Sequence, residues 1–331
     1  ATIIAGGDRE NTLAEMGSGS KMSFILSCIW EVANRDTDDV FLTLEEPENY
    51  LHPHSIRELH TTLDELSGGG DFVILTTHSP ELAGPRELNS VRRVERSNGS
   101  SIIKQPGDDL QEKDVQVLET IESSETKEIF FSRSLIICEG PSDRDVLQIA
   151  NDLLTKGNPE VRGFDAEGVS VVHAQGKHNV PKYLRVAKEF GIPTIAVLDT
   201  DINRDDGYGT SEIDWGTIRE SRSLSDQFVM LEKDLERALF EEIPLNKFHE
   251  TMKQLSEIGV IREYDLTIDD LQTEKECDPS IDHKSDLFVS YFNDYDPSKP
   301  ALGRELARQC GVESFPDRLQ HIVENAVELA E

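Results

Sequence analysis

Two short segments of this chain place carboxylates directly after apolar runs. Glu139 follows one such run, and Asp143 lies four positions further on. Asp199 and Asp201 follow a second run, and a spacing of two on an extended segment points both side chains the same way. Carboxylates gathered in this way repel one another unless cations share the charge. We therefore expect a two-metal site for Mg²⁺ or Mn²⁺, which prefer oxygen ligands.

A second set of residues suits nucleotide hydrolysis. The apolar run 40–44 ends in Glu45 and Glu46, and the run 72–75 leads to His78. One acid can hold Mg²⁺ through water, the next can orient the attacking water, and the histidine can contact a γ-phosphate. Upstream, the small residues Ser18 and Gly19 precede an apolar helical stretch, where the first turn of a helix offers an anion site.

The elements that must position these residues alternate between strands and helices. Short apolar runs predict buried strands, and longer periodic stretches predict helices. The expected strands are 40–44, 72–75, 135–138, 169–173 and 194–198, and the expected helices are 22–32, 55–66, 114–129 and 181–190. This alternation is typical of an α/β protein whose parallel strands are covered on both faces.

The first set of motifs resembles an ABC-type ATPase head. Glu15-Met16-Gly17-Ser18-Gly19-Ser20-Lys21 resembles the signature loop, Leu44 to Pro53 resembles the Walker B and D-loop segment, and Thr76 to Pro80 resembles the switch-histidine loop. The family usually carries Asp where Glu45 stands. No G-x-x-x-x-G-K-[ST] motif occurs in the sequence. The P-loop is therefore expected either in a truncated part of the same protein or on another chain.

The second set resembles the Toprim fold, because Glu139-Gly140-x-x-Asp143 and Asp199-x-Asp201 each follow an apolar strand. An ABC head followed by a Toprim domain resembles the OLD (overcoming lysogeny defect) family of ATP-dependent endonucleases. The resemblance implies Glu139, Asp143, Asp199, Asp201 and Glu236 as metal ligands, with Asp234 and Glu232 as alternatives to Glu236. It also implies a catalytic lysine, for which Lys299 is the candidate and Lys284 the alternative. Lys177, His178 and Asn179 are expected either to touch phosphate or to form a solvated turn.

The expected organisation has four parts. Residues 1–107 form the partial ATPase head, with Ser18, Gly19, Glu45, Glu46 and His78 facing nucleotide. Residues 108–132 form a connector helix, residues 133–240 the Toprim domain, and residues 241–331 a helical C-terminal extension of the nuclease.

The resulting expectation is a DNA endonuclease that hydrolyses phosphodiesters with two metals at Glu139, Asp199, Asp201 and Lys299. ATP, with Glu46 as catalytic acid, would act only with a P-loop supplied from elsewhere. DNA, a second copy of this chain and a separate P-loop chain are the expected partners, in phage defence or DNA repair. The alternative is a non-catalytic regulatory or scaffold subunit, or a remnant of a DNA-repair ATPase.

Composition limits the function classes and the cellular environment that fit this chain. The chain has 331 residues, with 65 Asp and Glu against 33 Lys and Arg, a formal net charge of -32. That balance argues against a basic DNA-binding module and favours adaptation to a salt-rich cytoplasm, where charges are screened. Four separated cysteines without a C-x-x-C pair argue against the zinc module of a primase. No apolar run is long enough to span a membrane.

Overall fold

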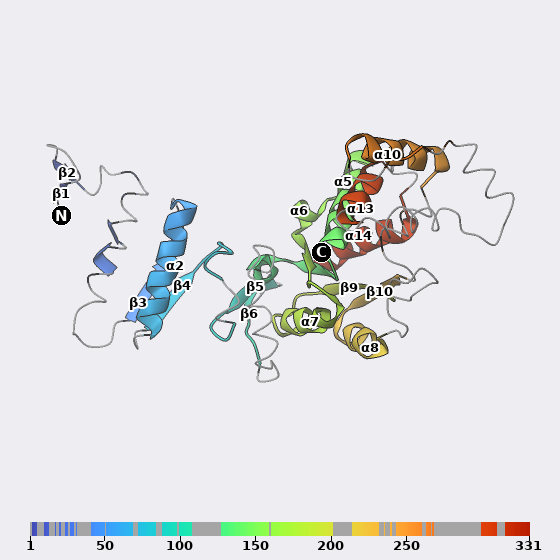
Figure 1. Ribbon diagram of the computed structural model, residues 1–331. Helices are drawn as coiled ribbons and strands as arrows, with labels where there is room; N and C mark the ends of the chain where they lie inside the picture. Colours follow the sequence, from blue (N-terminus) through green and yellow to red (C-terminus); the bar gives the residue numbers. More distant parts are fainter. Residues whose placement is uncertain are drawn as a thin grey trace. The chain divides into compact units, whose positions relative to one another are not determined.

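The computed structural model divides the chain into two compact units, residues 1–87 and 88–331 (Figure 1). The described residues are 2–4, 10–12, 17, 20, 24–25, 27–29, 31, 41–49, 51–68, 72–83, 88–97, 99–107, 127–158, 160–200, 214–231, 235, 239, 243–259, 263–265, 267, 299–309 and 315–331. Among these residues, no helix is both long enough and apolar enough to cross a membrane.

A parallel pair of strands and one helix position the described candidate residues of the first unit. The three elements are β3 (Phe41–Glu45), α2 (Pro53–Gly68) and β4 (Phe72–Thr76). The helix presents Leu59, Leu63 and Leu66 on one face, at the spacing of successive turns, and these side chains are buried against the strands. A separate antiparallel pair joins β1 (Thr2–Ile4) to β2 (Glu10–Thr12).

The second unit is built on a four-stranded parallel sheet. Its strands, in spatial order, are β10 (Gln227–Leu231), β9 (Thr194–Asp199), β7 (Ser134–Cys138) and β8 (Val169–His173). The central strand β7 is buried along its whole length, as its unbroken apolar sequence predicts. Because all four strands run the same way, their carboxyl ends meet at one edge of the sheet.

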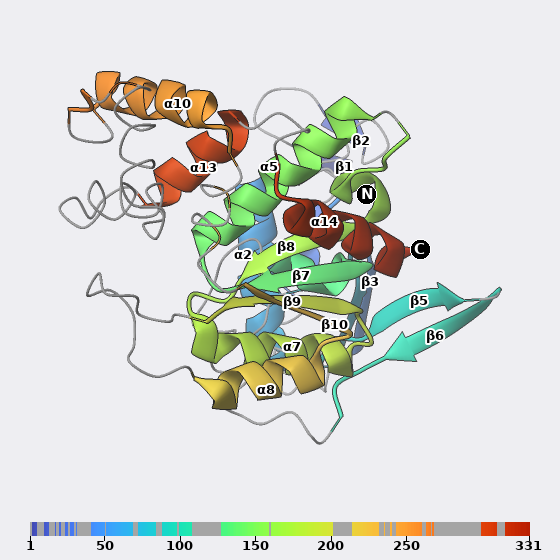
Figure 2. The ribbon, with the colours of Figure 1, turned by 90° about the vertical axis from the view of Figure 1, so that its right-hand side faces the viewer.

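Helices cover both faces of this sheet (Figure 2). One face is covered by α7 (Val180–Glu189) and α8 (Trp215–Leu224), and the other by α5 (Pro141–Gly157) and α14 (Asp317–Ala330). The short helix α6 (Phe164–Glu167) leads into β8. In α7, Val180, Tyr183, Leu184 and Ala187 are fully buried at helical spacing, which fixes the helix against the sheet.

The C-terminal helices share a core with the sheet. They are α10 (Leu245–Glu257), α13 (Lys299–Gln309) and α14. Met252 of α10, Leu306 of α13 and Ile322 of α14 belong to the same buried cluster as Ile136 of β7. The helical C-terminal part is therefore integrated into the second unit.

A hairpin absent from the sequence prediction belongs to the second unit. It joins β5 (Arg93–Ser97) and β6 (Ser100–Lys104) through a turn in which Gly99 has a φ of 80°. The Arg93 guanidinium donates to the carbonyl oxygens of Ser132, at 2.8 Å, and Phe190, at 3.3 Å. Residues 88–107 thus pack with the second unit, whereas the sequence analysis grouped them with the head. The domain limits at 107, 132 and 240 stay predictions.

The α/β class and the parallel strands are confirmed, with strand ends within one residue of prediction. Strand β10 was also missed, although its sequence, QFVML, is a mostly apolar run of the same length as β7 and β8. The described residues between 24 and 31 are helical, as expected. Most of the predicted connector helix lies outside the described residues, and its described end forms the 3-10 turn η3 (Ile129–Phe131).

Candidate active site

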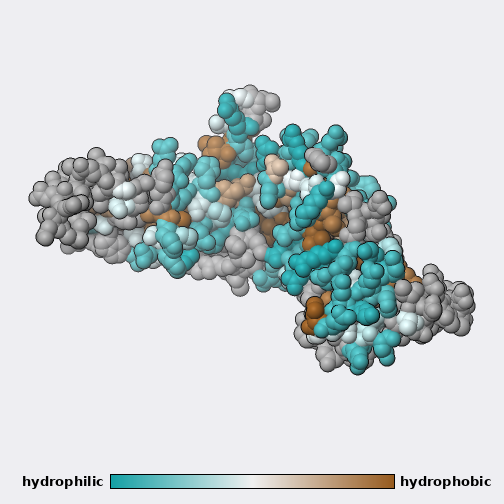
Figure 3. All heavy atoms as spheres, turned by 90° about the horizontal axis from the view of Figure 1, so that it is seen from above, coloured by the Kyte–Doolittle hydropathy of each residue, from teal (hydrophilic) through white to brown (hydrophobic). Residues whose placement is uncertain are grey.

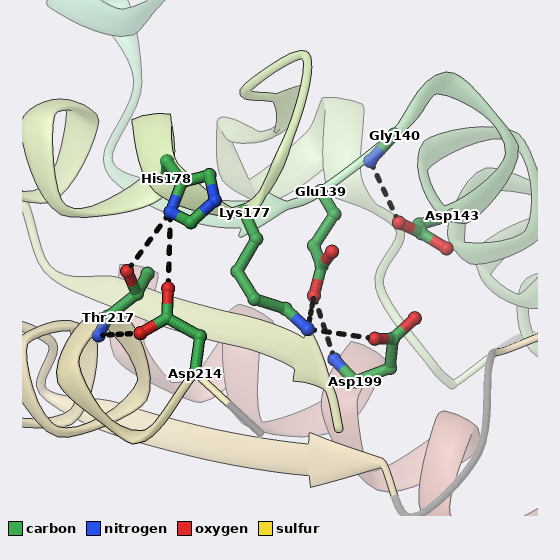
Figure 4. A network of polar contacts seen from close by, with 8 residues as sticks. All are labelled: Glu139, Gly140, Asp143, Lys177, His178, Asp199, Asp214 and Thr217. Carbon is green, nitrogen blue, oxygen red and sulfur yellow. Dashed lines mark hydrogen bonds and ion pairs between the residues drawn. The ribbon is translucent and has the colours of Figure 1, made fainter. Parts of the chain in front are cut away.

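The carboxyl edge of the four-stranded sheet brings two predicted metal ligands together with a lysine (Figure 4). Glu139 follows β7, Asp199 ends the neighbouring strand β9, and Lys177 lies in the loop after β8. Since β7 lies between β8 and β9, these three side chains come from adjacent strands. Such an edge is where parallel α/β sheets place ligands.

The two acids are held by direct contacts. The Asp199 backbone amide donates a hydrogen bond to Glu139 Oε1 at 2.9 Å. Lys177 Nζ donates to Asp199 Oδ1 at 3.1 Å and lies 3.5 Å from Glu139 Oε1. The Lys177 side chain is 6% exposed, against 16% for Glu139 and 20% for Asp199. A buried ammonium therefore balances two partly buried carboxylates.

The loop after β8 is shaped to bury that ammonium. Gln175 adopts a φ of 54°, uncommon for a residue other than glycine, and Gly176 follows with a φ of 121°. The Gly176 amide donates to the Glu139 carbonyl at 2.8 Å, and Asn179 Nδ2 donates to the Ala174 carbonyl at 3.1 Å. The turn η4 (Lys177–Asn179) then directs Lys177 inward. Unusual backbone conformations of this kind concentrate at functional sites.

Asp143, the third predicted ligand, forms a helix-capping hydrogen bond at the start of α5. Its Oδ2 accepts a hydrogen bond from the Gly140 amide at 2.9 Å and caps the first turn of α5. Figure 4 shows it beside Gly140, set apart from the Glu139–Asp199 pair. Burial of the Cys138 thiol raises its pKa well above the ordinary value, and the negative charge of Asp143 adds a smaller effect in the same direction. Cys138 is therefore a core residue and no nucleophile.

An exposed histidine stands beside this cluster. His178 Nδ1 lies 3.1 Å from Asp214 Oδ2 and 3.4 Å from Thr217 Oγ1. Asp214 also caps α8 by accepting from the Thr217 amide at 3.1 Å. Hydrogen bonds from Thr217 lower the pKa of Asp214, and His178 adds a smaller effect in the same direction. The His178 side chain is 81% exposed, so it remains open to a ligand.

A divalent cation fits the described part of this site. Carboxylate oxygens converge from two strands, and their negative charge already attracts the Lys177 ammonium. Among the described residues, no group of three His, Cys, Asp or Glu side chains forms a complete ligand set. The predicted ligands Asp201 and Glu236, and the alternatives Asp234 and Glu232, lie outside the described residues.

The predicted catalytic lysine is only partly placed. Lys299 is the first residue of α13, a helix that packs on α5. The contacts of its side chain are not among those described. Lys284 lies outside the described residues altogether. Sequence reasoning also missed the central position of Lys177, which it had offered only as a phosphate contact. The signal available in the sequence was the Gly176-Lys177 step, which begins three residues after the end of β8.

The first unit brings its predicted acid and histidine into contact. Glu46, with a φ of 41°, lies just beyond β3, and its Oε1 is 3.3 Å from His78 Nε2. The Glu46 amide donates to the Thr76 carbonyl at 2.9 Å. Glu48 accepts from Thr77 Oγ1 at 2.6 Å and from the His78 amide at 2.8 Å. Glu45 ends β3, while Ser18 and Gly19 lie outside the described residues.

Comparisons with known proteins agree with both sets of motifs. Residues 130–201 match the family described as "Overcoming lysogenization defect protein-like, TOPRIM domain", and residues 3–83 match the AAA ATPase domain. These matches confirm the resemblance to the OLD family and the combination of an ATPase segment with a Toprim domain.

The relatives are longer than this chain. An OLD nuclease of Thermus scotoductus is 26% identical over 200 residues, which cover 57% of this chain and 36% of the relative. The Old nuclease of Escherichia phage P2 is 24% identical over 201 residues, covering 57% and 33%. Endonuclease GajA of Bacillus cereus is 24% identical over 191 residues, covering 50% and 26%. The matched region is thus about a third of each relative or less.

Solved structures give a weaker likeness. The C-terminal region of the Xanthomonas campestris pv. campestris OLD protein has 21% identity and a TM-score of 0.43, covering 61% of this chain and 96% of that chain. The C-terminal region of the Burkholderia pseudomallei OLD protein has 16% identity and a TM-score of 0.41, covering 60% and 99%.

Proposed function

We propose that this chain, which joins an ATPase segment to an OLD-like Toprim domain, cleaves the phosphodiester backbone of DNA. The observation that carries the proposal is the convergence of Glu139 and Asp199 at the carboxyl edge of the Toprim sheet. Relatives named as nucleases match 50–57% of this chain at 24–26% identity and support the same chemistry. Mg²⁺ or Mn²⁺ is the proposed cofactor, in a two-metal arrangement.

The residues at this edge of the sheet have different proposed roles. Glu139 and Asp199 would hold the metals, joined by Asp201 and Glu236 and with Asp143 at the start of α5. Bound metals supply an activated water and stabilise the charge on the leaving 3′ oxygen. Lys299, at the start of α13, is proposed to offset charge on the phosphate. His178, exposed and oriented by Asp214, is placed to contact a neighbouring phosphate.

The ATPase segment is proposed to control this nuclease. Glu45 and Glu46 would hold the Mg²⁺ and orient water, with His78 contacting the γ-phosphate and with Ser18 and Gly19 at the nucleotide. ATP would act only with a P-loop, from a longer form of the protein or from a separate chain. DNA, a second copy of this chain and that P-loop are the proposed partners, within the cytoplasm, in phage defence or DNA repair.

A plasmid-cleavage experiment tests the proposal. The chain should nick supercoiled DNA with Mn²⁺ or Mg²⁺ and stop when a chelator removes the metal. Because the 3′ oxygen is the leaving group, the nicks should carry 3′-hydroxyl and 5′-phosphate ends that DNA ligase reseals. Asp199→Ala should abolish nicking. Nicking that persists in this variant would place the activity elsewhere, and its complete absence from the wild type would favour the non-catalytic regulatory or scaffold subunit.

A further inference from the structure

Lys177 occupies the space between the two acids on which the nuclease site is built. Its ammonium contacts Asp199 Oδ1 at 3.1 Å and lies 3.5 Å from Glu139 Oε1. We propose that Lys177 is a built-in counter-ion, which holds the two carboxylates together without metal and is displaced from them when the divalent cation binds. The inference rests on the proposed function in one respect: it takes Glu139 and Asp199 as metal ligands.

The placement of Lys177 is specific. The side chain is 6% exposed, although lysine is rarely buried without a partner. The loop reaches this position through the unusual backbone of Gln175 and Gly176, and the Gly176 amide is anchored to the Glu139 carbonyl. A lysine that only needed to reach DNA phosphate would be served by an exposed position on the same loop, as at His178. The fold instead directs this charge onto the acids.

Competition follows from the atoms involved. The two carboxylates proposed to hold the cation, Glu139 and Asp199, are the same groups that face Lys177 Nζ, through Oε1 and Oδ1. An ammonium and a divalent cation cannot both sit between them at close range, because the two positive charges would repel each other. Metal binding and the lysine contacts are thus linked: the lysine contacts weaken metal binding, and bound metal weakens the lysine contacts by the same factor.

Two properties should result. Without metal, the ammonium keeps the carboxylates from repelling each other, so the site is formed before the cation arrives. With metal, displacing the lysine costs part of the binding free energy. The site therefore needs a higher metal concentration to fill than it would without the lysine. The displaced ammonium is then free to turn outward.

The first test compares Mn²⁺ affinities by following free Mn²⁺ with electron paramagnetic resonance, without DNA. Lys177→Met keeps the length of the side chain and removes its charge. We expect its Kd for Mn²⁺ to fall roughly tenfold, within the usual range for coupled sites. The metal-free variant should also melt at a lower temperature than the wild type. Lys188→Met is the matched control, because Lys188 is exposed in the last turn of α7, and its Kd should equal that of the wild type.

A second variant and a second readout cover the case in which Lys177→Met does not fold. Lys177→Arg keeps the charge and should bind Mn²⁺ no more tightly than the wild type. In the wild-type protein, mild reductive methylation read by mass spectrometry should spare Lys177 without metal and label it when Mn²⁺ is present. Continued protection of Lys177 in saturating Mn²⁺ would overturn the displacement.

The outcomes separate this inference from the proposed function. If the wild type binds no Mn²⁺, or if Glu139→Gln with Asp199→Asn leaves binding intact, the proposed metal site itself is wrong. If the wild type binds Mn²⁺ through this pair and Lys177→Met binds it equally or more weakly, the metal site stands and the counter-ion role is wrong.

Discussion

The two units both place acids at the carboxyl ends of parallel strands, but they differ in what surrounds those strands. In the second unit, β7 and β9 are buried on both faces. In the first unit, alternate residues of β3 and β4 are only half-buried, and Phe41, Phe72 and Ile74 are 65%, 57% and 48% exposed. The same sequence signal, an apolar strand followed by acids, therefore occurs in a complete sheet and in a strand pair with an open face.

This difference determines which contacts and covering elements each candidate site already has. The Glu139–Asp199 pair has its counter-charge in place and a sheet covered on both faces. The Glu46–His78 pair is in contact, but its histidine is 83% exposed and its strands offer an apolar face to a further layer. We expect nuclease chemistry to need only metal and DNA, and ATP chemistry to need additional protein.

The largest expected effect falls on the second unit. Glu139→Ala should lower the rate of DNA cleavage by roughly a thousandfold or more, because a ligand of the reacting centre is lost. The metal-free protein should keep its fold, since Lys177 still pairs with Asp199. Cleavage rates and metal-free melting curves check both parts, with exposed Glu160→Ala as the control. A sharply lowered melting temperature in Glu139→Ala would mark the pair as structural.

The next effect concerns the first unit. This chain alone should hydrolyse no ATP above background, and adding a P-loop half should restore turnover. Glu46→Gln should then lower turnover by roughly a hundredfold or more and leave nucleotide bound, because the water-orienting carboxylate is gone. Phosphate release and nucleotide retention on a filter measure this. Robust hydrolysis by the isolated 331-residue chain would contradict the comparison between the units.

A smaller effect tests whether the β5–β6 hairpin belongs to the second unit. Arg93→Ala should destabilise the second unit by about 2 kcal/mol, because two hydrogen bonds from a charged donor to carbonyls of the sheet region are lost. Burial already lowers the pKa of this guanidinium, in keeping with its enclosed position. Urea unfolding followed by the second unit's signal measures the loss. Exposed Arg96→Ala should shift stability by less than about 0.5 kcal/mol.

The smallest effect concerns both units together. Hydrophilic residues cover much of the described surface in Figure 3, and the net charge is -32. Molar KCl should screen the repulsion between acids, and a gain of about 1 kcal/mol would raise the melting temperature by roughly 2–4 °C. DNA binding should require divalent metal and weaken only slightly with salt, because few phosphates are neutralised by lysine or arginine. Salt-insensitive melting would contradict the salt adaptation.

The sequence predicted those parts of the fold that local pattern determines. Apolar runs located the five strands β3, β4, β7, β8 and β9, and the acids that follow them identified both candidate sites. The β5–β6 hairpin was missed because its strands, RVERS and SSIIK, are mostly polar and are held by Arg93 contacts to distant carbonyls. The role of Lys177 was missed for a related reason: burial of a charge depends on acids 22 and 38 positions away. Such long-range pairings leave no periodic trace in the sequence.

The contact between β7 and α14 has a consequence for the timing of synthesis. Ser134 Oγ donates to the Ala326 carbonyl at 2.7 Å, a contact that spans 192 positions, and α14 buries Leu319, Ile322 and Val323 in the core beside the sheet. A ribosome adding 5–20 residues per second needs roughly 10–40 s to make the intervening chain. Throughout that interval the central strand lacks one of its covering helices. The proposed metal site should therefore form only after α14 has emerged, and an unfinished chain would then lack the proposed nuclease activity.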